Sequence, residues 1–403
     1  MTDDRELRRL IATRIQKTDP QRVPFATFMD WALYEPRLGY YAAPRQKIGA
    51  GGDYTTSPHL GADFGELLAE QLLDLWISLE RPAVFQVVEM GAGQGLIAGD
   101  VLTYLSDRAS TSPTSDYAHL WQSLQYVIVE KTQAFIAEQR HALKPFVETD
   151  GKLAWRTWDE IPDRSILGCC FSNELVDAFP VHCIEIQDQQ LQEIYVTVAD
   201  STVDHPQFTE VVASPSTPAL QTYLAEMGIE IDRYPEGYRS EINLAAQDWL
   251  KTLAQKLDRG YVLTIDYGHT AAQYYSPQRH QGTLQCYYRQ AHHNDPYWAV
   301  GHQDITAHVN FTALQHFGQS CGLVALNFTQ QGLFLMALGL GDHLSANLTA
   351  PKLDLTEILH RREALHALIN PMGLGGFGVL LQGAGNVPDS AHYPFKGFQM
   401  DLI

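Results

Sequence analysis

The sequence predicts an α/β fold with a mostly parallel sheet, preceded by a helical segment and interrupted by an antiparallel insertion. Apolar strands and amphipathic helices alternate over residues 85–172, which is the pattern of parallel strands joined by crossover helices. The alternation stops over residues 182–214, where short strand-like runs flank a turn at residues 188–190. It returns over residues 241–265, so the insertion interrupts a single sheet.

The periodicity of apolar residues predicts each element in turn. Leucine and isoleucine at helical spacing over residues 5–17 and 60–79 predict two amphipathic helices before the sheet begins. A glycine-rich loop is expected over residues 39–58, and an exposed Ser/Thr-rich loop over residues 106–115. The predicted helices span residues 5–17, 25–33, 60–79, 96–105, 132–143, 241–257 and 311–320. The predicted strands of the sheet span residues 85–90, 125–129, 153–158, 166–172, 261–265, 323–328 and 376–382, and the last of them could close the sheet.

These elements suggest three segments along the chain. We expect a helical segment with a lid loop over residues 1–59, and a C-terminal tail over residues 386–403. The sheet domain lies between them, over residues 60–385, and contains the insertion at about 182–240.

The composition indicates a globular, acidic protein. Hydrophobic residues make up 45% of the chain, and its net charge of −19 disfavours nucleic acid as a partner because both would be negative. A basic protein or peptide would be attracted, although acidity can equally serve solubility alone. The five cysteines include no CxxC pair, and no apolar stretch is long enough to span a membrane, so we expect a cytoplasmic protein.

The loop after the first strand of the sheet indicates the ligand. Gly91, Gly93 and Gly95 allow a tight turn and a close approach of the backbone to a ligand. A dinucleotide fingerprint would have its third glycine at Leu96 instead, which disfavours an NAD-dependent oxidoreductase. Glu89 would repel a pyrophosphate but suits a cationic amino-acid head such as that of S-adenosylmethionine. The alternative is an ordinary turn between a strand and a helix.

Other residues at the strand ends are expected to contact the same cofactor. Glu130 ends the second strand, where a carboxylate can accept both ribose hydroxyls; otherwise it is a solvated surface acid. We also expect Trp158, at the end of the third strand, and Asn173, after the fourth, to bind the cofactor.

A hydroxyl-rich loop before the sheet is the candidate lid. It contains Thr55, Thr56 and Ser57, which we expect to fold over the cofactor and exclude water. A simple surface turn is the alternative.

Two other patterns carry no function. Residues 318–322 match G-x-S-x-G, but a helix precedes them and a strand follows, the reverse of a hydrolase elbow, so Gly322 is expected to end the helix. The histidines of residues 292–308 share no ligand spacing with an acid or a cysteine, so we expect no metal.

Longer stretches of the chain match a known family. The chain resembles the MidA-like S-adenosylmethionine-dependent methyltransferases, which include the mitochondrial complex I assembly arginine methyltransferase. Where this family usually has proline in the glycine loop, the chain has Ala92. The matching stretches are PFATFMDWALYEPRLGYYA from Pro24, GDYTTSPHLGADFGELLA from Gly52, VVEMGAGQG from Val87, SNELVDAFPV from Ser172, LTIDYGH from Leu263 and GHQDITAHVNFTAL from Gly301.

The resemblance implies a class I methyltransferase fold, S-adenosylmethionine as cofactor and a protein arginine, on a complex I-type subunit, as acceptor. Glu174 and Asp177, three apart on a turn expected to start a helix, are candidates to hold the cationic guanidinium. Asp266 and His269, after the next strand, are candidates to orient it or to take its proton. One alternative is that Glu174 or Asp177 only caps the helix, and another is an assembly chaperone that binds the cofactor without turnover.

Overall fold

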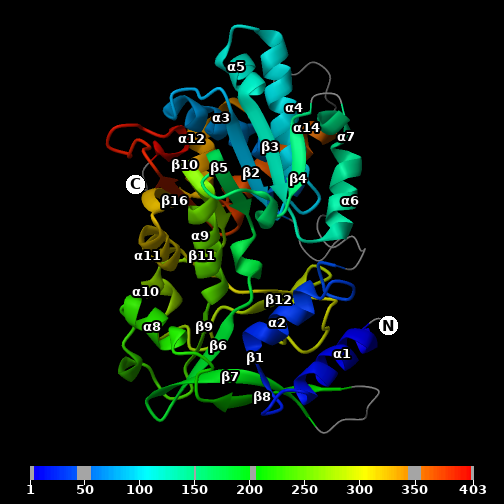
Figure 1. Ribbon diagram of the computed structural model, residues 1–403, viewed down its shortest axis with the longest axis vertical. Helices are drawn as coiled ribbons and strands as arrows, with labels where there is room; N and C mark the ends of the chain where they lie inside the picture. The colour runs from blue at the N-terminus through cyan, green and yellow to red at the C-terminus, as the bar shows by residue number, and fades with distance from the viewer. Residues whose placement is uncertain (1–3, 43–55, 149–150, 200–205, 344–354, 401–403) are drawn as a thin grey trace. The chain divides into compact units, whose positions relative to one another are not determined.

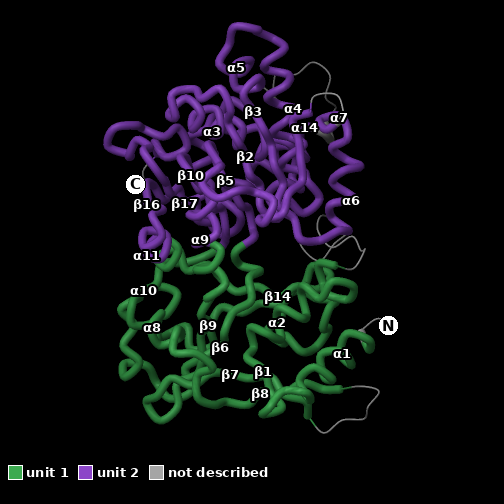
Figure 2. The backbone as a smooth tube through the Cα atoms, viewed as in Figure 1, with its two compact units in different colours: residues 1–54, 176–249, 268–314 green, residues 55–175, 250–267, 315–403 purple. Residues whose placement is uncertain are grey.

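The computed structural model describes residues 4–42, 56–148, 151–199, 206–343 and 355–400 (Figure 1). The chain forms two compact units, and each is built from three separate stretches (Figure 2). Unit 1 comprises Met1–Tyr54, Val176–Trp249 and Gly268–Leu314, and unit 2 comprises Thr55–Leu175, Leu250–Tyr267 and Gln315–Ile403. The units therefore interleave along the chain, whereas the three segments proposed from the sequence follow one another.

Unit 2 contains the seven-stranded sheet, in the order β16-β17-β10-β5-β2-β3-β4. Neighbouring strands from β10 to β4 are parallel, whereas β17 is antiparallel to both β10 and β16. The last strand of the chain thus inserts between two earlier ones and does not close the sheet at an edge. The strands are β2 (Phe85–Met90), β3 (Leu124–Val129), β4 (Leu153–Arg156), β5 (Ile166–Asn173), β10 (Leu257–Asp266), β16 (Val324–Gln330) and β17 (Gly378–Ala384).

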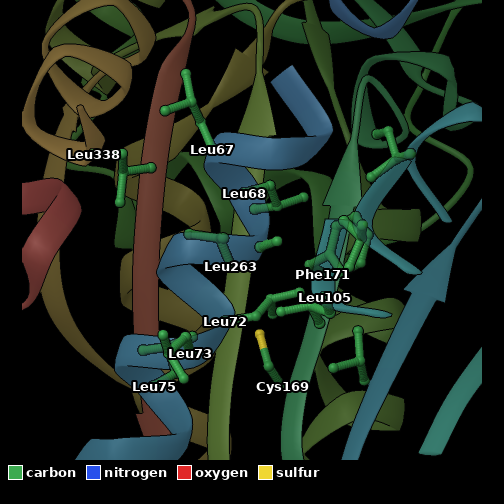
Figure 3. Close-up of a cluster of buried hydrophobic side chains, with 14 of the residues drawn as sticks. Leu67, Leu68, Leu72, Leu73, Leu75, Leu105, Cys169, Phe171, Leu263 and Leu338 are labelled. Atoms are coloured by element: carbon green, nitrogen blue, oxygen red, sulfur yellow. The ribbon is translucent and has the colours of Figure 1, made fainter. Parts of the chain in front are cut away.

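One face of this sheet packs against helices in a single hydrophobic cluster. Because side chains alternate along a strand, Cys169 and Phe171 of β5 point to the same face, where they cluster with Leu263 of β10 and with Leu68 and Leu72 of α3 (Figure 3). The helices of unit 2 are α3 (Asp63–Ser78), α4 (Leu96–Thr111), α5 (Asp116–Ser123), α6 (Gln133–Ala142), α7 (Lys144–Glu148), α12 (Gln331–Leu338) and α14 (Leu355–Ile369). Short 3-10 turns are η1 (Ser57–Leu60), η2 (Trp158–Glu160), η5 (Leu374–Gly376) and η6 (Lys396–Phe398).

Unit 1 contains the antiparallel insertion, as the sequence predicts. Its main sheet has the order β1-β7-β6-β9, with β8 also paired to β7. The turn between β6 and β7 places Asp188 and Gln189 at positive φ, 51° and 57°. The strands of unit 1 are β1 (Val23–Pro24), β6 (His182–Gln187), β7 (Gln190–Val198), β8 (Phe208–Ala213), β9 (Arg239–Ile242), β11 (Gly268–His269), β12 (Gln285–Tyr288), β13 (Ala291–His293), β14 (Asp304–Thr306) and β15 (Val309–Asn310).

The N-terminal helices belong to the core of unit 1. Leu7 of α1 and Phe28 of α2 share a buried cluster with Ile194 and Val196 of β7. The helical elements of unit 1 are α1 (Asp4–Gln16), α2 (Phe25–Tyr34), α8 (Ala219–Glu226), α10 (Ala271–Tyr274), η3 (Val176–Ala178) and η4 (Ile231–Arg233). Two further helices, α9 (Leu244–Lys256) and α11 (Phe311–Cys321), begin in unit 1 and end in unit 2.

Two local expectations from the sequence are wrong. The helix expected to end at residue 105 continues to Thr111, and in its last turns the hydroxyls of Ser110 and Thr111 bond back to the carbonyl oxygens of Ser106 and Asp107 (2.9 and 3.0 Å). Trp158 lies in a 3-10 turn after β4, not in the strand.

Apart from the helix expected near Glu174, the other predicted helices and strands are present within a few residues, and Gly322, at φ 93°, follows α11 as expected. In the part of the chain that the structure describes, no helix is long and apolar enough to cross a membrane.

The segment after β17 packs against α3 of unit 2. Phe395 is buried and contacts the ring of Tyr261, while Lys396 Nζ forms an ion pair with Glu70 (2.6 Å). The backbone N–H of Gly397 donates to Gln71 Oε1 (2.9 Å).

The Phe395→Ala variant should therefore lower the free energy of unfolding by about 3 kcal/mol, because it leaves a cavity between α3 and β10. Urea denaturation measures this loss. Met372→Ala, at a side chain that is 93% exposed, is the control. A loss below about 1 kcal/mol for Phe395→Ala would mean that the segment does not contribute to the core.

Candidate functional site

The candidate site of unit 2 lies at the carboxyl ends of its parallel strands. From β2 the chain proceeds outward to β3 and β4, and later passes to β5 and β10 on the other side of β2. The order of connection therefore reverses between β2 and β5, and ligands of open α/β sheets bind at such a switch point.

The loop between β2 and α4 has a backbone that only glycine adopts easily. Gly91, Gly93 and Gly95 have φ values of 67°, 53° and 79°. A Cβ on Gly91 would lie 2.7 Å from Leu175 Cδ1. Gly95 offers no side chain to cap α4, so the N–H groups of the first helical turn are suited to an anionic group of a ligand.

Glu89, next to the end of β2, is a buried acid. The phenol of Tyr126 donates a hydrogen bond to Glu89 Oε2 (2.7 Å), and the side chain is 2% exposed. Burial raises the pKa of Glu89 to about 8, and the negative charges of Glu130 and Asp100 add to the rise. Within the residues described, no basic side chain forms an ion pair with it. A cationic ligand would supply the missing charge.

The raised pKa makes the stability of the ligand-free protein depend on pH. Because the folded-state pKa lies above the unfolded value, Glu89 favours folding below about pH 4.5, and this contribution is lost as the pH rises through about 8. We expect Glu89→Gln to stabilise the ligand-free protein at about pH 9, on the order of a few kcal/mol, and to change little at about pH 5.

Denaturation at the two pH values measures this difference. Glu138→Gln, at an exposed position of α6, is the matched control and should leave both stabilities unchanged. An equal effect of Glu89→Gln at both pH values would contradict the assignment of a neutral, buried acid.

Glu130 follows β3, and Asn173 is the last residue of β5, at the same edge of the sheet. The backbone N–H of Thr132 donates to Glu130 Oε1 (2.9 Å), and burial raises the pKa of Glu130. Asn173 Nδ2 donates to Glu174 Oε1 (3.1 Å), while its buried Oδ1 has no partner among the described residues. Trp158 is half-buried in η2, after β4. Each predicted cofactor residue of these three strands therefore lies at or just beyond the carboxyl end of its strand.

The predicted lid is described only in part, because Thr55 and the residues just before it lie outside the described ranges. The hydroxyl of Thr56 bonds to His59 Nδ1 (2.7 Å), and His59 Nε2 bonds to Gln94 Oε1 in the glycine loop (3.0 Å). The backbone N–H of Ser57 donates to Glu174 Oε1 (3.4 Å). The contact between His59 and Gln94 could not be predicted from the sequence, because the two residues are 35 positions apart and no local pattern joins them.

Glu174 and Asp266 lie together in unit 2. Glu174 has a positive φ of 51°, and its N–H donates to the carbonyl of Ile265 (2.9 Å), next to Asp266. Asp266 is fully buried and accepts hydrogen bonds from the backbone N–H groups of Leu175 (3.2 Å) and Tyr267 (2.8 Å). Burial, and then repulsion by Asp266, raise the pKa of Glu174 to about 8. A cation bound beside both carboxyl groups would offset the repulsion between them and favour their charged forms.

The other two candidate catalytic residues, Asp177 and His269, belong to unit 1. Asp177 lies in η3, and its carbonyl accepts from the N–H of Ala307 (2.9 Å). His269 Nε2 contacts the guanidinium of Arg279 (3.1 Å), and burial together with that charge lowers the pKa of His269. The acid that unit 2 places beside Glu174 is therefore Asp266.

The helix expected to begin near Glu174 is absent from this described stretch. Only the three residues of η3, Val176–Ala178, are helical before β6 begins at His182. The alternative in which Glu174 or Asp177 caps an α-helix therefore has no helix to act on.

A second group of polar side chains, at the start of α3, is an ion-pair cluster. Ligand atoms of Asp63, Glu66 and His343 lie within 4.8 Å of one another. The guanidinium of Arg361, however, bonds to both oxygens of Asp63 (2.6 and 3.0 Å). Burial would raise the pKa of Asp63, but bonds from His343 and Arg361 hold it at about 2.

Comparison with known proteins gives one family-level match. Residues 67–329 match the model of a family described as S-adenosyl-L-methionine-dependent methyltransferases.

Relatives of known name are similar over most of their length. The Drosophila melanogaster protein arginine methyltransferase NDUFAF7 homolog, mitochondrial, is 28% identical over 346 residues, which are 82% of this chain and 74% of that protein. The Homo sapiens protein arginine methyltransferase NDUFAF7, mitochondrial, is 27% identical over 82% of this chain and 73% of its own. Since these relatives are described as mitochondrial, the cytoplasmic location expected from the sequence is wrong.

Two solved structures share the whole fold. A COG1565 superfamily member from Burkholderia thailandensis, bound to S-adenosyl-homocysteine, aligns with a TM-score of 0.82 and 28% identity, over 96% of this chain and 94% of that chain. A second crystal structure of a COG1565 superfamily protein from the same organism aligns with a TM-score of 0.80 and 28% identity, over 98% and 95% of the two chains.

Proposed function

Because the chain belongs to the family of S-adenosyl-L-methionine-dependent methyltransferases, we propose that it methylates an arginine side chain of a protein. It has the class I methyltransferase fold and uses S-adenosyl-L-methionine as its cofactor. What we propose is the acceptor, the residues that bind it and the residues that bind the cofactor.

The switch-point edge fits the chemical groups of this cofactor. Glu89 offers a buried charge for the ammonium, Glu130 offers acceptors for the ribose hydroxyls, and the turn at Gly93 lets the backbone approach. The unpartnered Oδ1 of Asn173 offers one more acceptor. S-adenosylmethionine supplies a methyl group on a positively charged sulfur. We assign further contacts to Trp158 and to the lid residues, Thr55, Thr56 and Ser57.

The pairing of Glu174 with Asp266 is the observation that carries the arginine assignment. One planar cation between two carboxylates can donate hydrogen bonds to both and relieve the repulsion that, after burial, raises the pKa of Glu174. The carboxylates would also stabilise positive charge as the nitrogen is alkylated. The names of the relatives, protein arginine methyltransferases, support this acceptor. A neutral acceptor would leave the charge of the second buried carboxylate without compensation.

The remaining assignments follow from the same proposal. We assign Asp177 and His269 to orienting the acceptor or removing its proton, His269 being suited to the second task because its lowered pKa favours the neutral ring. The resemblance to the complex I assembly methyltransferase suggests a complex I-type subunit as the acceptor protein.

Methyl transfer from labelled S-adenosylmethionine tests the proposal. The acceptors are the proteins of a lysate from a strain that lacks this gene, and mass spectrometry locates the label. We expect label on arginine. Label on lysine or on a small molecule would overturn the arginine assignment, whereas cofactor binding without any transfer would favour an assembly chaperone.

A further inference from the structure

A fully buried glutamine, Gln139 on α6, connects the elements that surround the proposed cofactor site. Its Oε1 accepts a hydrogen bond from the indole N–H of Trp155 on β4 (2.8 Å). Its Nε2 donates to the carbonyl oxygen of Gly93 in the glycine loop (2.7 Å). Its side chain also lies near enough to Glu130, after β3, to lower the pKa that burial raises. One amide thus bonds to groups from two elements of unit 2 and lies near a third.

The chemistry of these partners fixes the orientation of the amide. An indole N–H can only donate, so the oxygen of Gln139 faces Trp155 and its NH₂ group faces the acceptor Gly93 O. In a trans peptide the C=O and the next N–H point in opposite directions. The Gly93 carbonyl faces α6, so the N–H of Gln94 is turned away from α6.

The packing around Gln139 also restricts the loop. A Cβ on Gly95 would lie 3.2 Å from Gln139 Cγ and 3.1 Å from Leu143 Cδ1. The loop and α6 are therefore in close contact, and a shift of Gln139 would move the loop with it.

We infer that Gln139 is a positioning residue for cofactor binding, which holds the Gly93–Gln94 peptide of the glycine loop in register with Trp155 of β4. The inference rests on the proposed assignment of the cofactor to this edge. Gln139 itself is too enclosed to contact the ligand, and it acts through Gly93.

The charged groups around Gln139 determine how it is tested. Glu130 lies near its amide, and the charge of Glu130 adds to the rise in the pKa of Glu89. On α6 itself, the guanidinium of Arg140 stacks over the ring of Trp155 at 5.0 Å.

The Gln139→Glu variant keeps the shape of the side chain but removes its donor at high pH. At about pH 8 the new carboxylate would face the Gly93 carbonyl oxygen with no proton to donate, and the affinity for S-adenosyl-homocysteine should fall at least roughly tenfold relative to the unmodified protein. At about pH 5.5 a protonated carboxyl can accept from Trp155 and donate to Gly93 O, so the ratio of the two affinities should shrink to about threefold or less. Calorimetry at both pH values measures the ratios.

Two further variants separate positioning from general damage. Gln71→Glu is the matched control, because Gln71 is equally buried and bridges Asp74 and the N–H of Gly397, away from the site. It should lose stability without a change in affinity. Trp155→Phe keeps an aromatic ring but removes the N–H that bonds to Gln139 Oε1, so the amide can rotate. This variant should weaken binding about threefold or more.

A readout without ligand is the indole N–H resonance of Trp155, identified by its loss in Trp155→Phe. It should shift in Gln139→Glu with pH. The inference is overturned if Gln139→Glu binds as the unmodified protein does, or is weakened equally at both pH values while Trp155→Phe binds normally. If the unmodified protein itself fails to bind S-adenosyl-homocysteine, the proposed site is wrong instead.

Discussion

Glu174→Gln should lower the rate of methyl transfer at least roughly tenfold, because each charge-assisted bond to a guanidinium contributes about 1.5–3 kcal/mol. The amide keeps the shape of the side chain and its contact with Asn173, so cofactor affinity should not change. Labelled transfer to an arginine-bearing protein measures the rate, and calorimetry measures the affinity. Glu138→Gln is the control for a carboxylate removed at the surface.

The pH dependence adds a second readout to the same variant. Because the pKa of Glu174 is raised to about 8, the free enzyme gains its charged form only as the pH approaches that value. We therefore expect kcat/KM for the acceptor to rise with pH up to about 8, and this rise to disappear in Glu174→Gln. Full activity of the variant with an unchanged pH profile would exclude Glu174 from binding the acceptor.

Gly93→Val should abolish measurable binding of S-adenosylmethionine. A β-branched residue at φ 53° is strongly disfavoured, so the loop would leave the conformation that presents its backbone to the ligand. The hydrogen bond from Gln139 Nε2 to the Gly93 carbonyl oxygen would be lost as well. Calorimetry measures the affinity, and denaturation shows whether the variant is folded.

Gly322→Val provides the matched control for backbone strain. Gly322 also has a positive φ, 93°, and a Cβ there would meet no atom within 4 Å. It precedes β16, at the end of the sheet opposite the carboxyl ends of the parallel strands. This variant should lose stability and keep its affinity for the cofactor. A folded Gly93→Val protein that binds normally would refute the assignment of the loop.

Features that depend on local spacing could be predicted from the sequence. Strand β2 begins and ends at the residues expected, Phe85 and Met90, since a short apolar run before a glycine cluster marks both limits. The position of Glu89 and Glu130 at strand ends follows in the same way. The match to a methyltransferase family then confirmed the fold class and the cofactor that these residues suggested.

Features that join distant residues were decided only by the tertiary structure. Spacing suggested that Glu174 acts with Asp177, but the backbone bond from Glu174 to Ile265 sets it beside Asp266, and the turn after it continues into a strand and not a helix. The contacts of Gln139 with Gly93 and Trp155 span 46 and 16 residues and leave no periodic trace.

The interleaving of the two units has the same origin. The sequence by itself determined the strands, the glycine loop and the acids at strand ends, because backbone preference and the alternation of apolar side chains act over a few residues. The tertiary structure decided the position of β17 between β10 and β16, and the grouping of α1 and α2 with the antiparallel insertion. These depend on which apolar faces bury one another, and burial is a property of surfaces brought together from distant parts of the chain.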